Sequence, residues 1–258
     1  MSEAVISIRD LTMAYGSRLI QQDVNFDVMR GDIFVIMGGS GCGKSTLLKH
    51  LLGLIEPARG TISYGSQNFT RAGPAERQAL RQNWGITYQS GGLISAMTLA
   101  DNVALPLEQY SNYSASDIRD IVALKLALVG LDGYQDFLPA EISGGMRKRA
   151  ALARAIALDP DILFFDEPSA GLDPISSRRL DDLILQLKES TGASVVMVTH
   201  ELPSIFAIAN NAIYLDADSK RMIDSGNPAW MREHSEHAVV RQFLNRAADH
   251  ASGETSHE

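Results

Sequence analysis

The sequence predicts an α/β fold with a mainly parallel sheet, an N-terminal antiparallel β region and an inserted helical subdomain. Apolar and polar residues alternate over residues 5–15 and 21–32, as in half-buried strands. The short apolar run Ile33–Met37 passes through a glycine-rich turn into a helical pattern. A strand–helix–strand pattern over residues 161–198 indicates parallel pairing, because a helical crossover joins parallel strands.

Turn residues bound the first two strands, at Tyr15-Gly16-Ser17 and at Arg30-Gly31-Asp32. The run TLLKHLLGL, which begins at Thr46, has apolar residues at helical spacing and ends before Glu56-Pro57. This region therefore predicts two strands, a buried strand, a glycine loop and a helix, in that order.

The middle of the chain is helical in pattern from about residue 98 to 158. SDIRDIVALKLALVGL opens on a Ser/Asp cap and closes near Gly130 or Gly133. GGMRKRAALARAIAL is rich in Ala and Arg and stops at Pro160. We interpret residues of about 90–160 as a helical subdomain inserted in the α/β core.

The α/β pattern resumes with apolar strands at Asp161–Phe165 and Ser194–Val198. Pro174–Thr191 between them predicts a helix with Pro in its first turn. We assign residues 1–225 to one domain and residues 226–258 to a C-terminal helical extension. Its end, ADHASGETSHE, has the composition of a disordered tail.

Composition narrows the class of protein. A chain of 258 residues with 45% hydrophobic residues suits a soluble protein with a sizeable core. The net charge of −8 argues against nucleic acid as the main partner.

Cys42 is the one cysteine, which fits a reducing cytoplasm. The N-terminus has no signal-peptide pattern, and no apolar run reaches the ~18 residues of a membrane span, so any spanning would fall to other chains.

A phosphate-binding loop follows the first buried strand. Residues 38–45 fit the pattern G-x-x-x-x-G-K-[ST] in full. Glycines let backbone N–H groups surround a phosphate, and the following helix adds its N-terminal dipole. Lys44 can reach the β- and γ-phosphate oxygens, and the Ser45 hydroxyl can ligate Mg²⁺. The predicted nucleotide-binding residues here are Gly38, Gly39, Ser40, Gly41, Cys42, Gly43, Lys44, Ser45 and Thr46.

Two carboxylates end the strand before residue 168. Asp166 at the strand tip can hold the Mg²⁺ shell, and Glu167 can polarise the attacking water as general base. An acidic pair alone is more often a cap for the next segment. With the Gly-Lys-Ser loop, it predicts a phosphate-loop NTPase core that binds and hydrolyses ATP with Mg²⁺.

The segment Glu141–Arg147 resembles the signature sequence of ABC ATPase subunits, and the resemblance covers nearly the whole chain. In that family the signature binds the γ-phosphate of ATP held by a partner subunit. A Ser hydroxyl, glycine N–H groups and a helix N-terminus suit such an anion site, here at Ser143, Gly144 and Gly145. The resemblance implies a head-to-tail homodimer with two ATP molecules at its interface.

Other family elements follow in the family's order. Gln89 resembles the loop glutamine that contacts Mg²⁺ and senses the membrane partner, and His200 resembles the switch histidine on the γ-phosphate. Residues 169–173, SAGLD, resemble the loop that crosses the dimer interface. Tyr15 stands where the family stacks an aromatic ring on adenine. The resemblance thus implies catalytic roles for Lys44, Gln89, Glu167 and His200, with metal ligands Ser45, Gln89 and Asp166.

The signature here reads ISGGM, where the family usually has LSGGQ, and Met146 cannot replace the hydrogen bonds of Gln. This form resembles the ATPases of bacterial lipid transporters that work with MCE proteins, the Mla-type phospholipid systems. Residues 88–93, 101–107 and 240–244 add to that resemblance, whereas SAGLD is the general ABC form. It implies integral membrane permease subunits and an MCE-domain lipid-binding protein as partners. It also implies a peripheral place on the cytoplasmic side of the bacterial inner membrane.

Three alternatives stay open from the residues. The chain could serve an ABC transporter for another solute, or be an ABC ATPase outside transport, although it lacks the long coiled coil or fused second unit usual there. The third alternative is a phosphate-loop kinase, which should lack the Ser-Gly-Gly signature and the distal His.

The apolar segment Ser90–Leu107 fits either a membrane-partner contact or subdomain core. At Cys42 a helix N-terminus could lower the thiol pKa, but a small residue that fits the loop is the favoured interpretation.

Overall fold

The computed structural model describes residues 3–251, with side chains described as far as Asn245. The described residues divide into two compact units: residues 3–73 with 196–251, and residues 74–195. The first unit contains β1 Ala4–Tyr15, β2 Arg18–Met29, β3 Ile33–Gly38, α1 Lys44–Leu51, β4 Arg59–Tyr64, β5 Gln67–Asn68, α7 Leu202–Ile208, β9 Asn211–Asp216, β10 Arg221–Gly226, α8 Pro228–His234 and α9 Ala238–Ala251. The second contains α2 Pro74–Arg81, β6 Trp84–Thr87, α3 Leu99–Tyr110, α4 Ala115–Leu128, α5 Gly144–Ala155, β7 Ile162–Asp166 and α6 Pro174–Thr191, and β8 Ser194–Val198 lies on the division.

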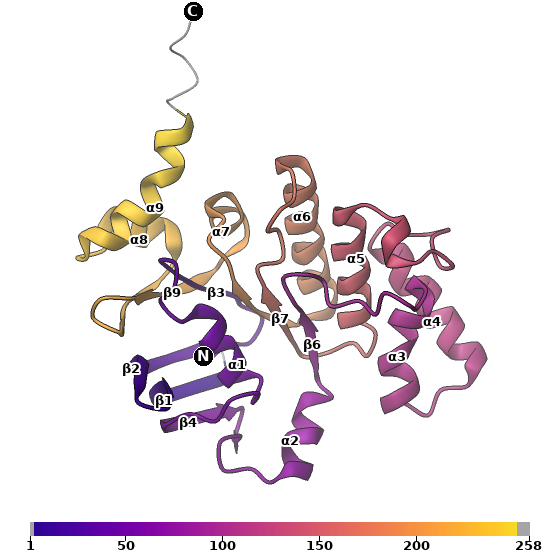
Figure 1. The fold of residues 1–258 in the computed structure, drawn as a ribbon, viewed down its shortest axis with the longest axis horizontal. Coiled ribbons are helices and arrows are strands. Elements are labelled where there is room, and N and C mark those ends of the chain that lie inside the picture. The colour runs from indigo at the N-terminus through magenta and orange to yellow at the C-terminus, as the bar shows by residue number, and fades with distance from the viewer. Residues whose placement is uncertain (1–2, 252–258) are drawn as a thin grey trace, which may run out of the picture. The chain divides into compact units, whose positions relative to one another are not determined.

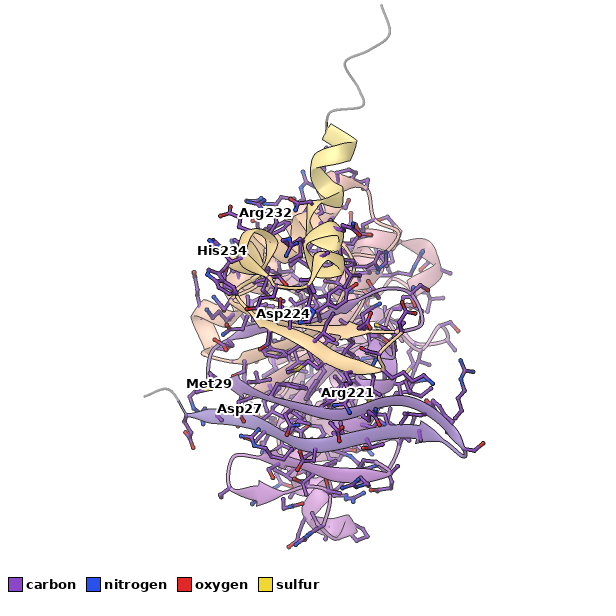
Figure 2. The ribbon with its side chains drawn as sticks, turned by 90° about the vertical axis from the view of Figure 1, so that its left-hand side faces the viewer. Asp27, Met29, Arg221, Asp224, Arg232 and His234 are labelled. Carbon is purple, nitrogen blue, oxygen red and sulfur yellow. The ribbon has the colours of Figure 1, made fainter. Side chains whose placement is uncertain are left out.

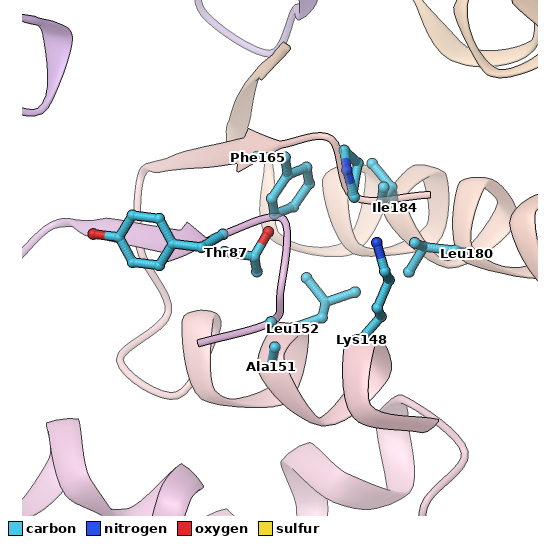
Figure 3. Close-up of a pocket in the computed structure, with 10 residues that line it drawn as sticks. Thr87, Lys148, Ala151, Leu152, Phe165, Leu180 and Ile184 are labelled. Carbon is cyan, nitrogen blue, oxygen red and sulfur yellow. The ribbon is translucent and has the colours of Figure 1, made fainter. Parts of the chain in front are cut away.

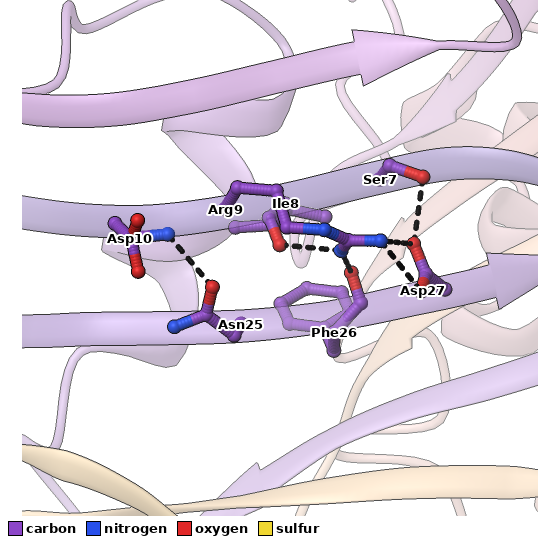
Figure 4. Close-up of polar contacts among 7 residues, drawn as sticks. All are labelled: Ser7, Ile8, Arg9, Asp10, Asn25, Phe26 and Asp27. Atoms are coloured by element: carbon purple, nitrogen blue, oxygen red, sulfur yellow. Dashed lines mark hydrogen bonds and ion pairs between the residues drawn. The ribbon is translucent and has the colours of Figure 1, made fainter.

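The predicted antiparallel region is a sheet in the order β2-β1-β4-β5 (Figure 1). β1 and β2 form a hairpin around Gly16-Ser17, and alternate residues such as Ile6 and Ile8 are fully buried. On the other face, Arg9 makes a bidentate ion pair with Asp27 at 2.8 Å to each carboxylate oxygen (Figure 4). One face of this hairpin therefore faces the core, as the alternation predicts.

The buried strand predicted at Ile33–Met37 is β3, which is buried along its whole length. It pairs in parallel with β9, and β9 pairs antiparallel with β10. β3 ends at Gly38, from which the chain turns through the glycine loop into α1. The strand–loop–helix order expected for a phosphate loop is confirmed.

In the second unit β6 and β7 pair in parallel, and Trp84 packs edge-on against Phe164 between them. Helices α3, α4 and α5 pack against one another (Figure 1). The predicted helix Pro174–Thr191 is α6, which Asp173 caps at its start and Gly192 ends with φ of 72°. These elements confirm the predicted α/β fold with helices added to its middle, while the assignment of domain boundaries stays a prediction.

Helices α8 and α9 follow β10 after Gly226 (Figure 2). Of the tail predicted to be disordered, residues 248–251 belong to α9, and residues 252–258 lie outside the described residues. Over the described part of the chain, every helix is too short or too polar to cross a bilayer.

Candidate functional site

The glycine loop between β3 and α1 has a backbone that glycine alone suits. Gly38, Gly41 and Gly43 have φ of 146°, 75° and 105°. A Cβ on Gly38 would lie 2.3 Å from the Leu215 carbonyl oxygen, so a side chain there would displace backbone. A Cβ on Gly39 or Gly41 would meet nothing within 4 Å, which leaves space beside the loop for a ligand.

Lys44 begins α1 and its side chain folds back along the loop. Its Nζ donates to the carbonyl oxygens of Gly38 at 2.9 Å and Gly39 at 3.0 Å. Ser45, in the first turn, is exposed and Thr46 half-buried. A cation, hydroxyls and a helix N-terminus thus meet at one loop, which is the donor set that a polyphosphate needs.

Cys42 does not behave as a thiol activated by a helix N-terminus. It is 1% exposed, and its burial raises the thiol pKa, with Lys44 opposing this only in part. The possible lowering of its pKa is therefore wrong, because desolvation of a thiolate outweighs the nearby charge. The alternative interpretation, a small residue that fits the loop, agrees with this burial.

Tyr15 and His200 also belong to the first unit. Tyr15 ends β1 and is 47% exposed, so its ring is accessible to a planar ligand. His200 follows β8, and its Nε2 lies 3.7 Å from Glu201 Oε1. Their roles toward adenine and the γ-phosphate stay predictions.

In the second unit, Gln89 and Asp166 line one open pocket of about 500 Å³, together with Tyr88, Ser90, Ala170 and Gly171. The structure therefore brings together the two predicted metal ligands of this unit. Among residues 3–245, whose side chains the structure describes, no group of three or more His, Cys, Asp or Glu could hold a metal. The amide of Gln89 and the carboxylate of Asp166 suit Mg²⁺, which commonly takes few protein ligands and completes its shell with phosphate and water.

Glu167 follows Asp166 with a backbone in the left-handed region, at φ of 50°, and is 9% exposed. Such a conformation is uncommon for a non-glycine residue and persists where neighbours hold it. One neighbour is Lys148, whose Nζ donates to the Glu167 carbonyl oxygen at 3.2 Å. Lys148 also lines a small cavity with Thr87, Leu152, Phe165 and others (Figure 3).

Burial lowers the pKa of Lys148, and Glu167 opposes this in part. Lys148 stands on α5, whose first turn is the Ser-Gly-Gly signature, so one helix connects the signature to the Glu167 backbone. Sequence reasoning missed this residue, because a lysine in an Ala/Arg-rich helix resembles ordinary surface charge.

We predict that Lys148→Met lowers the ATPase kcat several-fold with little change in the Kd for ATP, because it releases the backbone of Glu167 but touches no phosphate. Lys148→Arg is the matched control and should restore most of the rate, since a guanidinium can also donate to a carbonyl. The measurement is steady-state turnover beside equilibrium ATP binding. Equal kcat in wild type and Lys148→Met would contradict a positioning role.

Ser143 caps α5, and its Oγ accepts a hydrogen bond from the Met146 N–H at 3.2 Å. Ser143 and Gly144 are exposed and Gly145 is half-buried, so the first turn is accessible from outside the unit. Asp173 similarly caps α6, and its hydrogen bonds from Ser176 lower the carboxyl pKa. The signature thus forms an accessible helix N-terminus, the arrangement that binds anions.

A glycine-rich phosphate loop, a strand-end carboxylate pair and an exposed Ser-Gly-Gly helix start define a phosphate-loop ATPase that carries a signature sequence. The ABC transporter family model matches residues 21–170, and the chain belongs to that family. It is an ATP-binding, ATP-hydrolysing ABC subunit.

Relatives and solved structures agree on the family. The chain is 40% identical to the intermembrane phospholipid transport system ATP-binding protein MlaF of Haemophilus influenzae, over 96% of this chain and 93% of that protein. It is 41% identical to the probable ribonucleotide transport ATP-binding protein mkl of Mycobacterium leprae, over 93% of this chain and 68% of that protein. Its fold matches a dimeric, post-hydrolysis structure of the ATP-binding cassette MJ0796 with ADP and Pi, with a TM-score of 0.78 and 27% identity over 86% of this chain and 98% of that one.

Proposed function

We propose that this chain energises phospholipid transport between bacterial membranes, through a separate membrane permease. The observation that carries the proposal is the similarity to MlaF proteins, at 40% and 39% identity over 93% and 90% of their lengths. Met146 in the signature supports the same branch, as do the segments at residues 88–93, 101–107 and 240–244.

Within this proposal each predicted site residue has a specific role in ATP binding or hydrolysis. Lys44 and the loop residues 38–46 bind the phosphates, and Tyr15 stacks on adenine. Ser45, Gln89 and Asp166 would hold Mg²⁺, which would neutralise charge on the phosphates. Glu167 takes a proton from the attacking water, and His200 contacts the γ-phosphate.

The same proposal includes a homodimer. The phosphate loop and the Ser143–Gly145 turn are both accessible anion sites, and in the family they face each other across two chains. The dimeric cassette MJ0796 bound to ADP and Pi supports this arrangement. We propose permease subunits and an MCE-domain lipid-binding protein as further partners, with this chain at the cytoplasmic side of the inner membrane.

Ribonucleotide transport is the second candidate, because the mycobacterial mkl proteins are 41% identical to this chain. Identity does not separate the two candidates. The phospholipid relatives match over nearly their whole length, whereas the mkl match spans 68% of the M. leprae protein. We therefore place phospholipid first.

The segment Ser90–Leu107 combines core with an accessible loop. Leu99, Val103 and Leu107 on α3 are buried, whereas Ile94 is 40% exposed. The buried Asn102 amide fixes the loop, because its Oδ1 accepts from the Ile94 N–H at 2.7 Å and its Nδ2 donates to the Ile94 carbonyl at 3.1 Å. An exposed apolar side chain on a fixed loop suits the permease contact proposed here.

We predict that Ile94→Arg weakens binding to the permease at least about tenfold, since a charge would enter an apolar contact, while the ATPase activity of the isolated chain is retained. Leu124→Arg is the matched control: Leu124 is 57% exposed on α4, outside the proposed contact. Co-purification of each variant with the permease measures the effect. Equal loss of binding in both variants would contradict a contact at Ile94.

The transport assay uses the chain with its permease and MCE partner in proteoliposomes. ATP-dependent transfer of labelled phospholipid is the expected result, with ribonucleotide uptake measured in parallel. Ribonucleotide uptake without phospholipid transfer would replace the first candidate by the second.

A further inference from the structure

Gln21 on β2 is a fully buried amide behind the phosphate loop. Its side chain is 0% exposed. Its Nε2 donates to the carbonyl oxygens of Cys42 and Asp216, each at 2.8 Å. Both N–H groups of this amide can therefore be used, one on the loop and one on the end of β9.

The hydrogen bond to Cys42 fixes one peptide of the loop. The Cys42–Gly43 bond is trans, so the Gly43 N–H points away from the carbonyl that Gln21 holds. Gly43 is also seated closely against β2, because a Cβ on it would lie 2.7 Å from Ile20 Cγ2 and 3.5 Å from Gln21 Cγ. In a phosphate loop, N–H groups of this turn bind the nucleotide phosphates.

The second hydrogen bond, from Gln21 Nε2 to the Asp216 carbonyl, connects Gln21 to the end of β9. β2 is joined to the β9–β10 hairpin by a bond from the Gln22 N–H to the Lys220 carbonyl at 2.9 Å. Arg221 on β10 pairs with Asp23 on β2 at 2.9 Å, and Figure 2 shows Arg221 on the strand beside β2. Gln21 thus connects the loop to β2 and β9, and β2 is itself held to the β9–β10 hairpin by the two contacts above.

The Gln21 amide has two donors in use and an acceptor that is not. Its Oε1 is buried without a hydrogen-bond partner among the described residues, which costs folding free energy. An apolar side chain of similar volume would remove that cost but would leave the Cys42 and Asp216 carbonyl oxygens without these donors. The glutamine is therefore explained by its two donors, one of which fixes the loop at the Cys42 carbonyl.

We propose that Gln21 is a positioning residue for phosphate binding, which holds the Cys42–Gly43 peptide so that the Gly43 N–H is oriented for the nucleotide phosphates. This inference rests on nucleotide binding by the phosphate loop. It requires nothing about the transported solute.

The test uses Gln21→Met in the full chain, because Met keeps the volume but removes the donor. We expect the Kd values for ATP and ADP, measured by titration calorimetry, to rise together by about three- to tenfold, the effect of one neutral hydrogen bond. The thermal midpoint without nucleotide should stay the same or fall slightly, because Met removes the unpaired Oε1 but leaves two carbonyl oxygens without this donor. Gln22→Met is the matched control on the next position of β2, whose side chain points to the other face of the strand, and its affinities should not change.

ATP and ADP affinities within twofold of wild type would overturn the proposal, provided wild type binds ATP. Failure of wild type itself to bind ATP would refute the nucleotide site as a whole, which is a separate outcome. If Gln21→Met does not fold, Gln21→Asn replaces it. The shorter amide cannot reach Cys42, so the same loss of affinity is expected, and normal affinity in that variant would equally overturn the proposal.

Discussion

Replacing Glu167 by Gln is expected to lower ATP turnover by about 10²- to 10⁴-fold, the contribution of a positioned general base. The amide keeps the shape of the carboxylate but cannot accept the proton from water. ATP binding should persist, because the phosphate loop and its Lys44 are unchanged. The protein should then collect as an ATP-bound dimer, measured by light scattering and by the ATP retained after gel filtration.

Glu189→Gln is the matched control, since Glu189 is an exposed carboxylate on α6 and should keep full activity. Turnover by Glu167→Gln at the wild-type rate would remove Glu167 from the role of general base. Loss of ATP binding in that variant would also contradict this role, because a general base contributes to turnover and not to nucleotide affinity.

Ser143→Arg is the second large effect. We expect loss of ATPase activity by more than about 100-fold with an intact phosphate loop, since a bulky cation would fill the proposed anion site at the start of α5. Binding of ATP to the isolated chain should change little. Steady-state turnover and equilibrium ATP binding, measured on the same preparation, separate these two expectations.

Ser114→Arg is the matched control because Ser114 also caps a helix, α4, and is also exposed. Both variants lose an N-cap, which costs about 1 kcal/mol of stability. If Ser114→Arg lost as much activity as Ser143→Arg, cap loss would explain the effect and no shared site would be needed.

The phosphate loop could be predicted from sequence because its chemistry fixes residue types at fixed spacing. Gly38 and Gly43 have positive φ and close neighbours, so the sequence must carry glycine there. Helix α6 was equally predictable, since Asp173, Pro174 and Gly192 mark its ends locally. The signature needed the family resemblance, because Ser-Gly-Gly by itself is a common turn.

Contacts between distant segments could not be predicted in this way. Gln21 and Asp216 are 195 residues apart in the chain, and no local pattern relates them. The hydrogen bond from Lys148 Nζ to the Glu167 carbonyl depends on how α5 packs beside the end of β7. At Cys42 the sequence shows a helix N-terminus but not the burial that raises the thiol pKa.

We propose that each ATP is held by the phosphate loop of one copy and the signature of another. Mixing Lys44→Ala with Ser143→Arg protein tests it, because a mixed dimer places both defects in one site and leaves the other intact. Each variant alone should be inactive, and an equal mixture should recover roughly a quarter of the wild-type rate, since half of random dimers are mixed and each has one intact site. A mixture as inactive as its two components would contradict a site shared between copies.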